Sequence, residues 1–374
     1  MISKLDTNIP KLGFGLMRLP KINDVIDIEQ LKQMVDVYLE KGFTYFDTAW
    51  GYEKSEEAIK TALVDRYPRD RYLFATKMPA WMAHSKQEAE EMFWTSLRRT
   101  GLAYFDFYLL HNLGGTDNIR TDAFDKYDIW DFTAEQKRAG RIKHLGCSVH
   151  ASAEHLDEIL TAHPELEFVQ LQINYSDWDN PAIQSGKCYE VARKHDKPVI
   201  IMEPVKGGAL AALPEKAAAL LHRSNPHASQ ASWAIRYAAS LDGIMTVLSG
   251  MSTLEQLQNN VSFMTDFVPL DQDELKVIAE VQAVLSENQQ IPCTDCQYCL
   301  KGCPQNIAIP SIFKAKNDYL TFGDISRAKE MYAFQTRKTG KAHDCICCGM
   351  CEQVCPQGIS IMKELTSASA AFDV

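Results

Sequence analysis

The sequence predicts an α/β protein: a (β/α)8 barrel followed by a small, mainly helical domain rich in cysteine. Apolar, β-branched runs alternate with segments of helical periodicity up to about residue 285. Eight of these runs are strand candidates, and eight β-then-α units favour a closed parallel barrel over an open sheet. Beyond a helix expected at 271–288, the composition shifts to Cys, Pro and Gly. This shift predicts two domains, residues 1–288 and 289–374.

The eight strand candidates share dense apolar, β-branched or aromatic residues and lie at 12–19, 43–48, 72–78, 105–111, 142–149, 167–174, 198–203 and 243–250. Between them, apolar residues recur at intervals of three and four, which predicts helices at 27–42, 85–101 and 227–240. No G-x-G-x-x-G motif follows the first strand, which argues against a doubly wound sheet. In the second domain, 311–340 predicts two short helices joined at Gly323.

The charge and composition exclude several classes of protein. The chain has 374 residues, 46% of them hydrophobic and 24% charged, as expected for a globular protein with a sizeable core. Its net charge of -10 argues against nucleic acid as the main partner. We find no apolar region of a signal peptide and no run of about 18 apolar residues that would span a membrane. We therefore expect a cytoplasmic protein.

Four polar side chains stand where barrel strands end, the edge at which barrel enzymes place their active sites. Asp47, Lys77 and His111 end the second, third and fourth predicted strands, and Tyr52 lies five residues beyond Asp47. Taken singly, each has an ordinary explanation as a helix cap, a rim lysine, a core imidazole or a packing residue. Together they predict a catalytic site.

These four residue types suit the reduction of a carbonyl group. A phenol has a pKa of about 10, and it donates its proton more readily when a nearby ammonium stabilises the phenolate. Tyr52 would be the acid, Lys77 its activator and Asp47 the carboxylate that keeps Lys77 charged. A ring N–H of His111 would polarise the carbonyl oxygen, where negative charge develops during hydride addition.

Five segments resemble the aldo-keto reductases in order and spacing: FDTAWGY (46–52), ATKMP (75–79), YLLHNLG (108–114), LGCS (145–148) and LQINYS (171–176). The resemblance covers about residues 10–265. It implies a barrel that binds a nicotinamide cofactor at its C-terminal mouth and reduces aldehydes or ketones with the four residues named above. By position, it also implies that Ser148 and Gln172 hold the nicotinamide carboxamide and that Asn260 meets the adenine.

Some positions depart from this family. Val149 stands where the family often has Asn, and Met202 and Glu203 stand where many members stack an aromatic ring on the nicotinamide. Glu203 would either bind a substrate that carries a positive or donor group, or act as a structural carboxylate that is hydrogen-bonded to the barrel rim. Gly250 and Gln256 occupy the positions of the Lys or Arg residues that NADP-preferring relatives use. The resemblance thus implies NAD(P)H as the cofactor, without a preference for NADP.

Nine of the 11 cysteines fall between Cys293 and Cys355, which in a reducing compartment indicates metal binding rather than disulfides. The first four form C-x2-C-x2-C-x3-C-P, and the same spacing recurs from Cys345 to Pro356. Three thiolates spaced by two residues can hold three corners of a cubane, whereas structural zinc commonly uses two separated pairs. The spacing predicts two [4Fe-4S] clusters, with zinc as the weaker alternative.

In two-cluster ferredoxins, the fourth cysteine of each run ligates the other cluster. The predicted ligands of cluster one are Cys293, Cys296, Cys299 and Cys355. The predicted ligands of cluster two are Cys345, Cys348, Cys351 and Cys303. Cys347 is a spare thiol or an alternative ligand. The roughly 40 residues between the two runs resemble the helical ferredoxin-type domains fused to redox enzymes.

These observations predict an oxidoreductase of two modules. The barrel would move hydride between NAD(P)H and a small carbonyl or alcohol substrate, and the clusters would exchange single electrons with a ferredoxin or another carrier. Two alternatives stay open. The cysteine-rich second domain could be the functional part of the protein, with the barrel as a platform for a substrate or partner. Alternatively, the clusters could be structural or redox-sensing. A hydride carries two electrons and each cluster passes one, and no sequence motif marks a flavin to convert between them.

Overall fold

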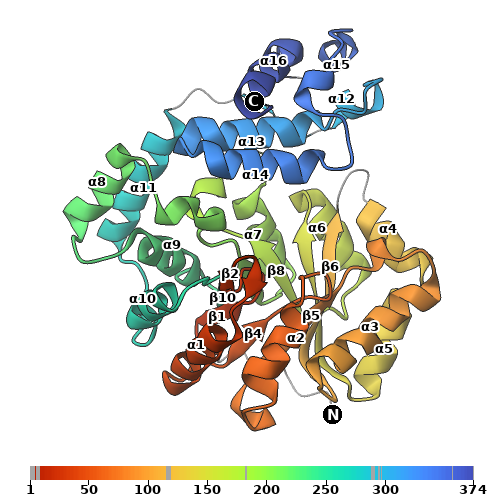
Figure 1. Cartoon of the computed structure of the whole chain (residues 1–374), viewed down its shortest axis with the longest axis vertical. Helices are drawn as coiled ribbons and strands as arrows, with labels where there is room; N and C mark the ends of the chain where they lie inside the picture. The colour runs from red at the N-terminus through yellow and green to blue at the C-terminus, as the bar shows by residue number, and fades with distance from the viewer. Residues whose placement is uncertain are drawn as a thin grey trace. The chain divides into compact units, whose positions relative to one another are not determined.

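The structure is a computed structural model that describes residues 5, 9–114, 119–181, 183–287, 291–293, 295, 297–355 and 357–373 (Figure 1). The chain divides into two compact units. One comprises residues 1–211 and 228–272, and the other comprises residues 212–227 and 273–374. The boundary expected near residue 288 lies outside the described residues, so the division into domains 1–288 and 289–374 stays a prediction.

Eight parallel strands close into a barrel in the first unit (Figure 1). Their order around the barrel is β1-β10-β9-β8-β7-β6-β5-β4. The strands are β1 (Leu12–Gly15), β4 (Tyr45–Asp47), β5 (Leu73–Met78), β6 (Phe105–Gly114), β7 (Ile142–His150), β8 (Phe168–Gln172), β9 (Val199–Met202) and β10 (Ile244–Ser249). Each overlaps one predicted strand, so the predicted (β/α)8 barrel is confirmed.

Helices follow the strands and cover the outside of the barrel (Figure 1). Some of them begin after a residue whose side chain accepts a hydrogen bond from the first turn, as Asp27 does from the Gln30 amide at 3.0 Å and Ser85 from the Glu88 amide at 3.1 Å. The helices of this unit are α1 (Ile28–Glu40), α2 (Ser55–Ile59), α3 (Lys86–Thr100), α4 (Ile119–Lys126), α5 (Ile129–Arg138), α6 (Ala153–Ala162), α7 (Ser185–Lys194), α9 (Gln230–Ala239) and α10 (Leu254–Met264).

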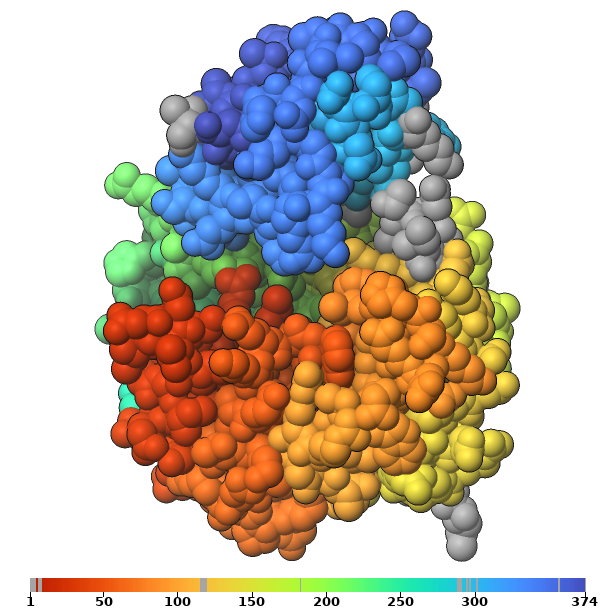
Figure 2. Space-filling model, turned by 45° about the vertical axis from the view of Figure 1, so that its right-hand side comes forward, coloured from red at the N-terminus to blue at the C-terminus, as the bar shows by residue number. Residues whose placement is uncertain are grey.

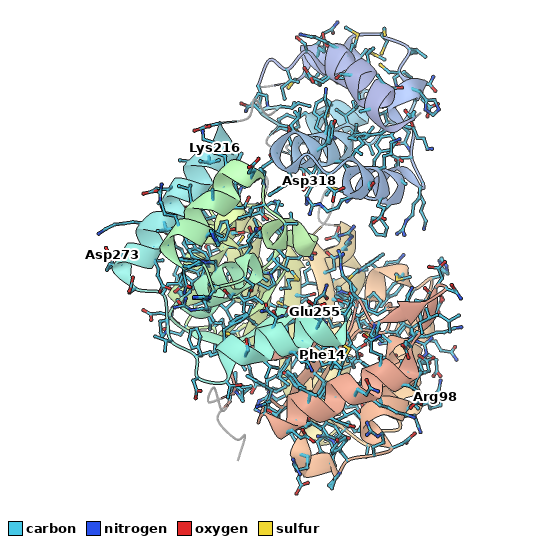
Figure 3. The ribbon with its side chains drawn as sticks, turned by 60° about the vertical axis from the view of Figure 1, so that its left-hand side comes forward. Phe14, Arg98, Lys216, Glu255, Asp273 and Asp318 are labelled. Carbon is cyan, nitrogen blue, oxygen red and sulfur yellow. The ribbon has the colours of Figure 1, made fainter. Side chains whose placement is uncertain are left out.

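Aromatic side chains fill the barrel interior. The ring of Phe107 lies 5.0 Å from that of Tyr45 and 5.4 Å from that of Phe168, measured between centroids. A Cβ at Gly146 would lie 2.6 Å from Phe168, so this close approach of two strands requires glycine. Phe14 is fully buried, whereas Arg98 lies on the outside of α3 (Figure 3). Segments from α1 to α3, red to orange, form a continuous surface over this core (Figure 2).

Two features of the first unit depart from the sequence-based expectation. A short antiparallel hairpin, β2 (Lys21–Ile22) with β3 (Val25–Ile26), follows β1, although no strand is predicted there. Its strands are only two residues long and largely exposed, so no hydrophobic periodicity reveals them. Strand β6 continues three residues beyond the predicted end at His111, with a register irregularity between Leu110 and Leu113. This extension shapes the site described below.

The second unit is helical among its described residues, as predicted. Its helices are α8 (Glu215–Ser224), α11 (Gln272–Ser286), α12 (Tyr298–Lys301), α13 (Ile309–Phe322), α14 (Ile325–Thr336), α15 (Met350–Gln353) and α16 (Ile361–Phe372). Gly323 ends α13 in a left-handed conformation, with φ of 73°, and Asp324 caps α14. The two short helices predicted on either side of Gly323 are thus confirmed. Ile312, Phe313 and Leu365 are among the buried residues of a separate core in this unit.

None of the helices in the described ranges combines the length and apolarity needed to cross a membrane.

Candidate functional site

Asp47 and Lys77 form a buried ion pair between neighbouring strands of the barrel. Asp47 is the last residue of β4, and Lys77 lies near the end of β5. The Lys77 ammonium donates to Oδ1 of Asp47 at 2.5 Å and to the Thr48 carbonyl at 2.7 Å. Burial by itself would lower the pKa of Lys77, but Asp47 and Tyr52 more than offset it, and the pKa is raised. Lys77 is therefore held in its charged form.

Tyr52 lies beside this pair, in the turn after β4. Nζ of Lys77 lies 5.2 Å from the centre of the Tyr52 ring. Burial raises the pKa of Tyr52, and the Lys77 ammonium offsets only part of this increase. The phenol consequently keeps its proton at neutral pH, while the ammonium beside it would stabilise the phenolate left after proton transfer.

His111 faces Tyr52 from β6. The two rings meet edge to face, with centroids 5.9 Å apart and an interplanar angle of 80°. Burial, reinforced by the positive charge of Lys77, holds the pKa of His111 well below 6.5, so the imidazole is neutral at physiological pH. Among the described residues, its Nδ1 atom is buried without a hydrogen-bond partner. The structure thus brings together all four residues of the predicted catalytic set.

Ser148 is connected to this group through β6. Its Oγ accepts a hydrogen bond of 2.8 Å from the backbone amide of Asn112, the residue after His111. Asn112 adopts a left-handed conformation with φ of 60°, within the irregular end of the strand. A hydroxyl that accepts one hydrogen bond can still donate its own hydrogen. Ser148 is therefore a donor beside the catalytic set.

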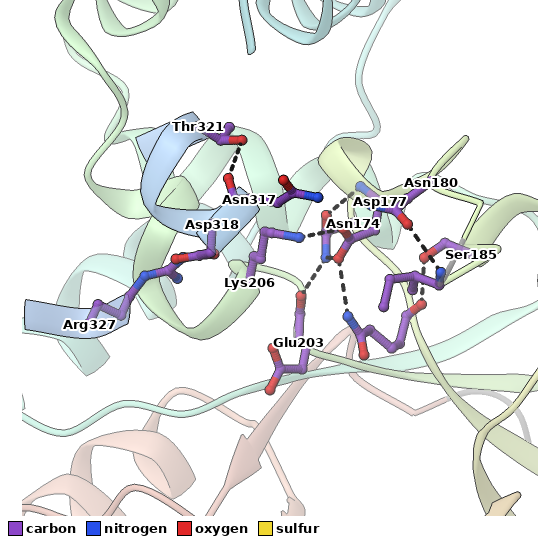
Figure 4. Close-up of polar contacts among 12 residues, drawn as sticks. Asn174, Asp177, Asn180, Ser185, Glu203, Lys206, Asn317, Asp318, Thr321 and Arg327 are labelled. Carbon is purple, nitrogen blue, oxygen red and sulfur yellow. Dashed lines mark hydrogen bonds and ion pairs between the residues drawn. The ribbon is translucent and has the colours of Figure 1, made fainter. Parts of the chain in front are cut away.

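Gln172 belongs to a second polar network on the same face, centred on the fully buried carboxylate of Asp177 (Figure 4). Oδ2 of Asp177 accepts from the side-chain amides of Gln172 at 3.1 Å and Asn174 at 2.9 Å, and Oδ1 pairs with Lys206. Asn174 also donates to the Glu203 carbonyl at 3.2 Å. Burial by itself would raise the pKa of Asp177. Lys206 and the two side-chain amides lower it by more than burial raises it, so the net shift is downward. No sequence pattern singled out Asp177 or Lys206.

Glu203 lies on the rim of the barrel mouth, after β9. Its side chain is exposed, and its backbone is left-handed with φ of 57°. The carboxylate is close enough to Tyr52 to contribute a minor increase to the pKa of the phenol. The negative charge of Glu203 therefore faces the same space as the catalytic set.

The remaining predicted cofactor residues, Gly250, Gln256 and Asn260, lie at the end of β10 and in α10. Asn260 is buried and donates to Oγ of Ser249 at 2.7 Å, whereas Gly250 and Gln256 are exposed. A Cβ placed on Gly250 would lie 3.8 Å from side-chain carbons of Arg18. The structure thus brings a guanidinium-bearing side chain from the turn after β1 to this position. Sequence reasoning missed it because the two residues lie far apart in the chain.

Four of the predicted cluster cysteines converge in the second unit. Cys303, Cys345, Cys348 and Cys351 line one cavity whose other walls include Ile307, Ile309 and Leu365. Sγ of Cys303 also accepts a hydrogen bond of 3.5 Å from the Ile307 amide. Four thiols in an apolar cavity with a backbone N–H aimed at sulfur form a donor set that suits a [4Fe-4S] cluster. These four are the predicted ligands of cluster two.

The predicted ligands of cluster one are incompletely described, because Cys296 lies outside the described residues. Cys299 is buried, and Cys293 and Cys355 are half-buried. All three pack against the core of the second unit. Cys347 is exposed, as is the predicted ligand Cys348, so its assignment as a spare thiol or an alternative ligand stays a prediction.

Comparison with known proteins identifies both parts of the chain. Residues 11–283 match the model of the aldo/keto reductase family. The chain belongs to the aldo/keto reductase family. It is an oxidoreductase of that family with a second region, residues 292–360, that matches a 4Fe-4S dicluster domain. An aldo-keto reductase from Mycolicibacterium vanbaalenii is 24% identical over 267 residues, which cover 71% of this chain and 87% of the relative.

Solved structures agree on the fold. An aldo-keto reductase from Bacillus halodurans, solved in a holo form, is 25% identical and superposes with a TM-score of 0.56 over 72% of this chain and 91% of its own. An aldo-keto reductase from Klebsiella pneumoniae in complex with NADPH is 19% identical, with a TM-score of 0.58 over 73% of this chain and 91% of its own. At 19% identity, the similarity to the Klebsiella enzyme supports the barrel fold alone.

Proposed function

We propose that this aldo-keto reductase reduces an aldehyde or ketone, with Tyr52 as the general acid and His111 orienting the carbonyl oxygen. A bound nicotinamide supplies the hydride. The carbonyl carbon would gain that hydride and the oxygen would gain the proton of Tyr52, so that an alcohol and the oxidised nicotinamide would be the products. The observation that carries the proposal is the buried contact set in which Lys77 joins Asp47 and faces the ring of Tyr52.

The protonation states favour this division of roles. The raised pKa of Tyr52 keeps a proton available at neutral pH, and the charged Lys77 receives the phenolate charge after transfer. Neutral His111 can donate one N–H to a carbonyl oxygen without competing as an acid. In the reverse direction, the same groups would take a proton from an alcohol.

The side chains near the mouth fit a nicotinamide carboxamide. The hydroxyl of Ser148 can donate to the carboxamide oxygen, since its accepting side is used by Asn112. The Nε2 atom of Gln172 is tied to Asp177, which leaves its oxygen to accept from the carboxamide nitrogen. Asn260 would meet the adenine. We propose NADH and NADPH as cofactors, because Arg18 beside Gly250 can supply the charge for a 2′-phosphate that Gly250 and Gln256 lack.

We propose that the second unit holds two [4Fe-4S] clusters with the interleaved ligand sets given above. The clusters supply one-electron carriers. Convergence of Cys303 with Cys345, Cys348 and Cys351 supports the interleaving, because Cys303 comes from the first cysteine run and the others from the second. The partner would be a ferredoxin or another electron carrier, and the location cytoplasmic, where thiols stay reduced.

One experiment tests both halves of the proposal. Protein purified without oxygen is analysed for iron and sulfide, and then mixed with NADH or NADPH, with and without a panel of aldehydes and ketones. We expect about eight iron and eight sulfide per chain, and nicotinamide oxidation that depends on the carbonyl. Zinc in place of iron would contradict the cluster assignment. Bleaching of the clusters by NAD(P)H without a carbonyl would instead favour the alternative in which the cysteine-rich domain carries out the function.

A further inference from the structure

Arg120 places a guanidinium beside the catalytic set. It is the second residue of α4, which follows the extended strand β6 that carries His111. Nη1 of Arg120 donates to Oδ1 of Asn112 at 2.8 Å, and its guanidinium lies 5.1 Å from the centre of the Trp81 ring. The indole N–H of Trp81 in turn donates to the His111 carbonyl at 3.1 Å. Arg120 is thereby fixed against the residues that flank the imidazole.

The charge of Arg120 is not balanced by a carboxylate within the described ranges of the chain. Its contacts there are a neutral amide and an aromatic face. Two other half-buried arginines of this barrel pair with carboxylates, Arg69 with Asp106 and Arg99 at 3.3 Å from Glu56, whereas Arg141, like Arg120, contacts an amide oxygen and an aromatic ring but lies away from the catalytic set. A guanidinium has five N–H donors, so a single hydrogen bond to Asn112 leaves most of them available.

Burial disfavours the charged form of Arg120, as it does for any ion that lacks a counter-charge nearby. It lowers the pKa of the guanidinium, and no group in the part of the chain that the structure describes opposes this shift. The positive charges of both Lys77 and Arg120 lower the pKa of His111, so they act on the same space at the mouth. Lys77 already has Asp47 as its partner. An anion entering the mouth would therefore be attracted to Arg120, beyond the end of β6, and repelled by Glu203, which follows β9 on the rim.

We propose that Arg120 binds an anionic group of the substrate, so that the enzyme prefers carbonyl compounds bearing a carboxylate or a phosphate. This inference rests on the proposed carbonyl reduction. A guanidinium offers two parallel N–H donors to such a group, and Trp81 and Asn112 hold its plane in place. With the anionic end held at Arg120, the carbonyl end would be left to Tyr52 and His111.

The test compares matched substrate pairs on the full protein. 4-Oxobutanoate is set against butanal, and glyceraldehyde 3-phosphate against glyceraldehyde; the two pairs distinguish a carboxylate from a phosphate. The variants are Arg120→Met and Arg120→Lys, with Arg138→Met as the control, because Arg138 is an exposed arginine of α5. We expect Arg120→Met to reduce the preference for the anionic member of one pair by about tenfold or more in kcat/KM. Arg120→Lys should retain part of the preference, and Arg138→Met all of it.

A second readout does not require turnover. Quenching of tryptophan fluorescence on titration with 4-oxobutanoate or glyceraldehyde 3-phosphate reports binding, and the part of the quenching that Trp81→Phe removes reports binding beside Trp81; Arg120→Lys should weaken this part. Equal kcat/KM for both members of each pair in the wild type would overturn the proposal, as would an Arg120 variant that changes only the KM of NAD(P)H. If no carbonyl is reduced but the anion still binds through Arg120, the proposed function fails and the anion site stands. Absence of binding as well would overturn the site.

Discussion

The ammonium of Lys77 lies 2.5 Å from a carboxylate oxygen of Asp47, and both side chains are buried at the end of adjacent barrel strands. A buried ion pair gains little over an apolar pair of similar size, but an unpaired buried charge costs several kcal/mol. The pair therefore serves the chemistry of the site more than the stability of the barrel.

Removal of one partner should affect both stability and activity. We expect Lys77→Met to lower the free energy of unfolding by about 3–5 kcal/mol, because Asp47 is left buried without its counter-charge. The double variant Asp47→Asn with Lys77→Met should recover much of this stability without recovering carbonyl reduction. Thermal unfolding of the two single variants and the double variant, with activity measured on each, gives the cycle. If the stability loss of the double variant equals the sum of the two single losses, Asp47 and Lys77 do not interact, and the proposed pair is contradicted.

The protonation of His111 predicts a particular pH dependence. Because its pKa in the folded protein is well below 6.5, kcat/KM should show no inflection near pH 6.5. Because the pKa of Tyr52 is raised above 10.0, activity should also persist up to that pH. The unfolded chain binds a proton at His111 as the pH falls below 6.5 and the folded chain does not, so this group makes stability fall as the pH falls. If kcat/KM instead changes with pH around a midpoint near 6.5, and this change is absent in His111→Gln, the prediction is contradicted.

Asp177 should matter to cofactor binding through Gln172. In Asp177→Asn, the charge that Lys206 pairs with is lost, and the acceptor that orients the Gln172 amide is altered. We expect a loss of about 3 kcal/mol in stability, because the ion pair between the buried Asp177 and Lys206 is broken, and a higher KM for the nicotinamide. Asp273→Asn is the matched control, because it breaks the exposed pair with Lys276, and such pairs contribute little. An unchanged KM in a folded Asp177→Asn protein would count against Gln172 as a carboxamide ligand.

The interleaved ligand assignment predicts which cysteine substitutions act together. Cys303→Ala and Cys345→Ala should each remove about four iron, and the double variant should lose no more, because both belong to one cluster. Cys293→Ala combined with Cys303→Ala should remove both clusters. Iron analysis under anaerobic conditions distinguishes these outcomes, with Cys347→Ala as the variant that keeps its iron. Loss of both clusters in Cys303→Ala combined with Cys345→Ala would show that each cluster draws on a single cysteine run.

The sequence predicted the barrel because its signals are local. The eight strands are apolar runs in the sequence, and helices such as α3 show apolar residues at intervals of three and four. The catalytic set could be predicted because barrel topology carries the ends of successive strands to one face, so that Asp47, Lys77 and His111 meet although they are distant in sequence.

The residues that the sequence did not reveal act through contacts between distant segments. Arg18 comes beside Gly250 because β1 pairs with β10, a closure between the two ends of the barrel. Asp177 ends a 3-10 helix of three residues, too short to show periodicity, and its contact with Lys206 joins two segments that are distant in the sequence. Arg120 contacts Asn112 at the irregular end of β6, a contact that no hydrophobic pattern encodes.

The most direct test of the account is carbonyl reduction by Tyr52→Phe, measured on anaerobically purified protein whose iron content is determined in the same preparation. Phenylalanine keeps the ring that packs on His111 and removes only the proton that we assign to the carbonyl oxygen. We expect a loss of about 10²–10⁴-fold in kcat with the iron content unchanged. A Tyr52→Phe protein that reduces the carbonyl at the wild-type rate would contradict it.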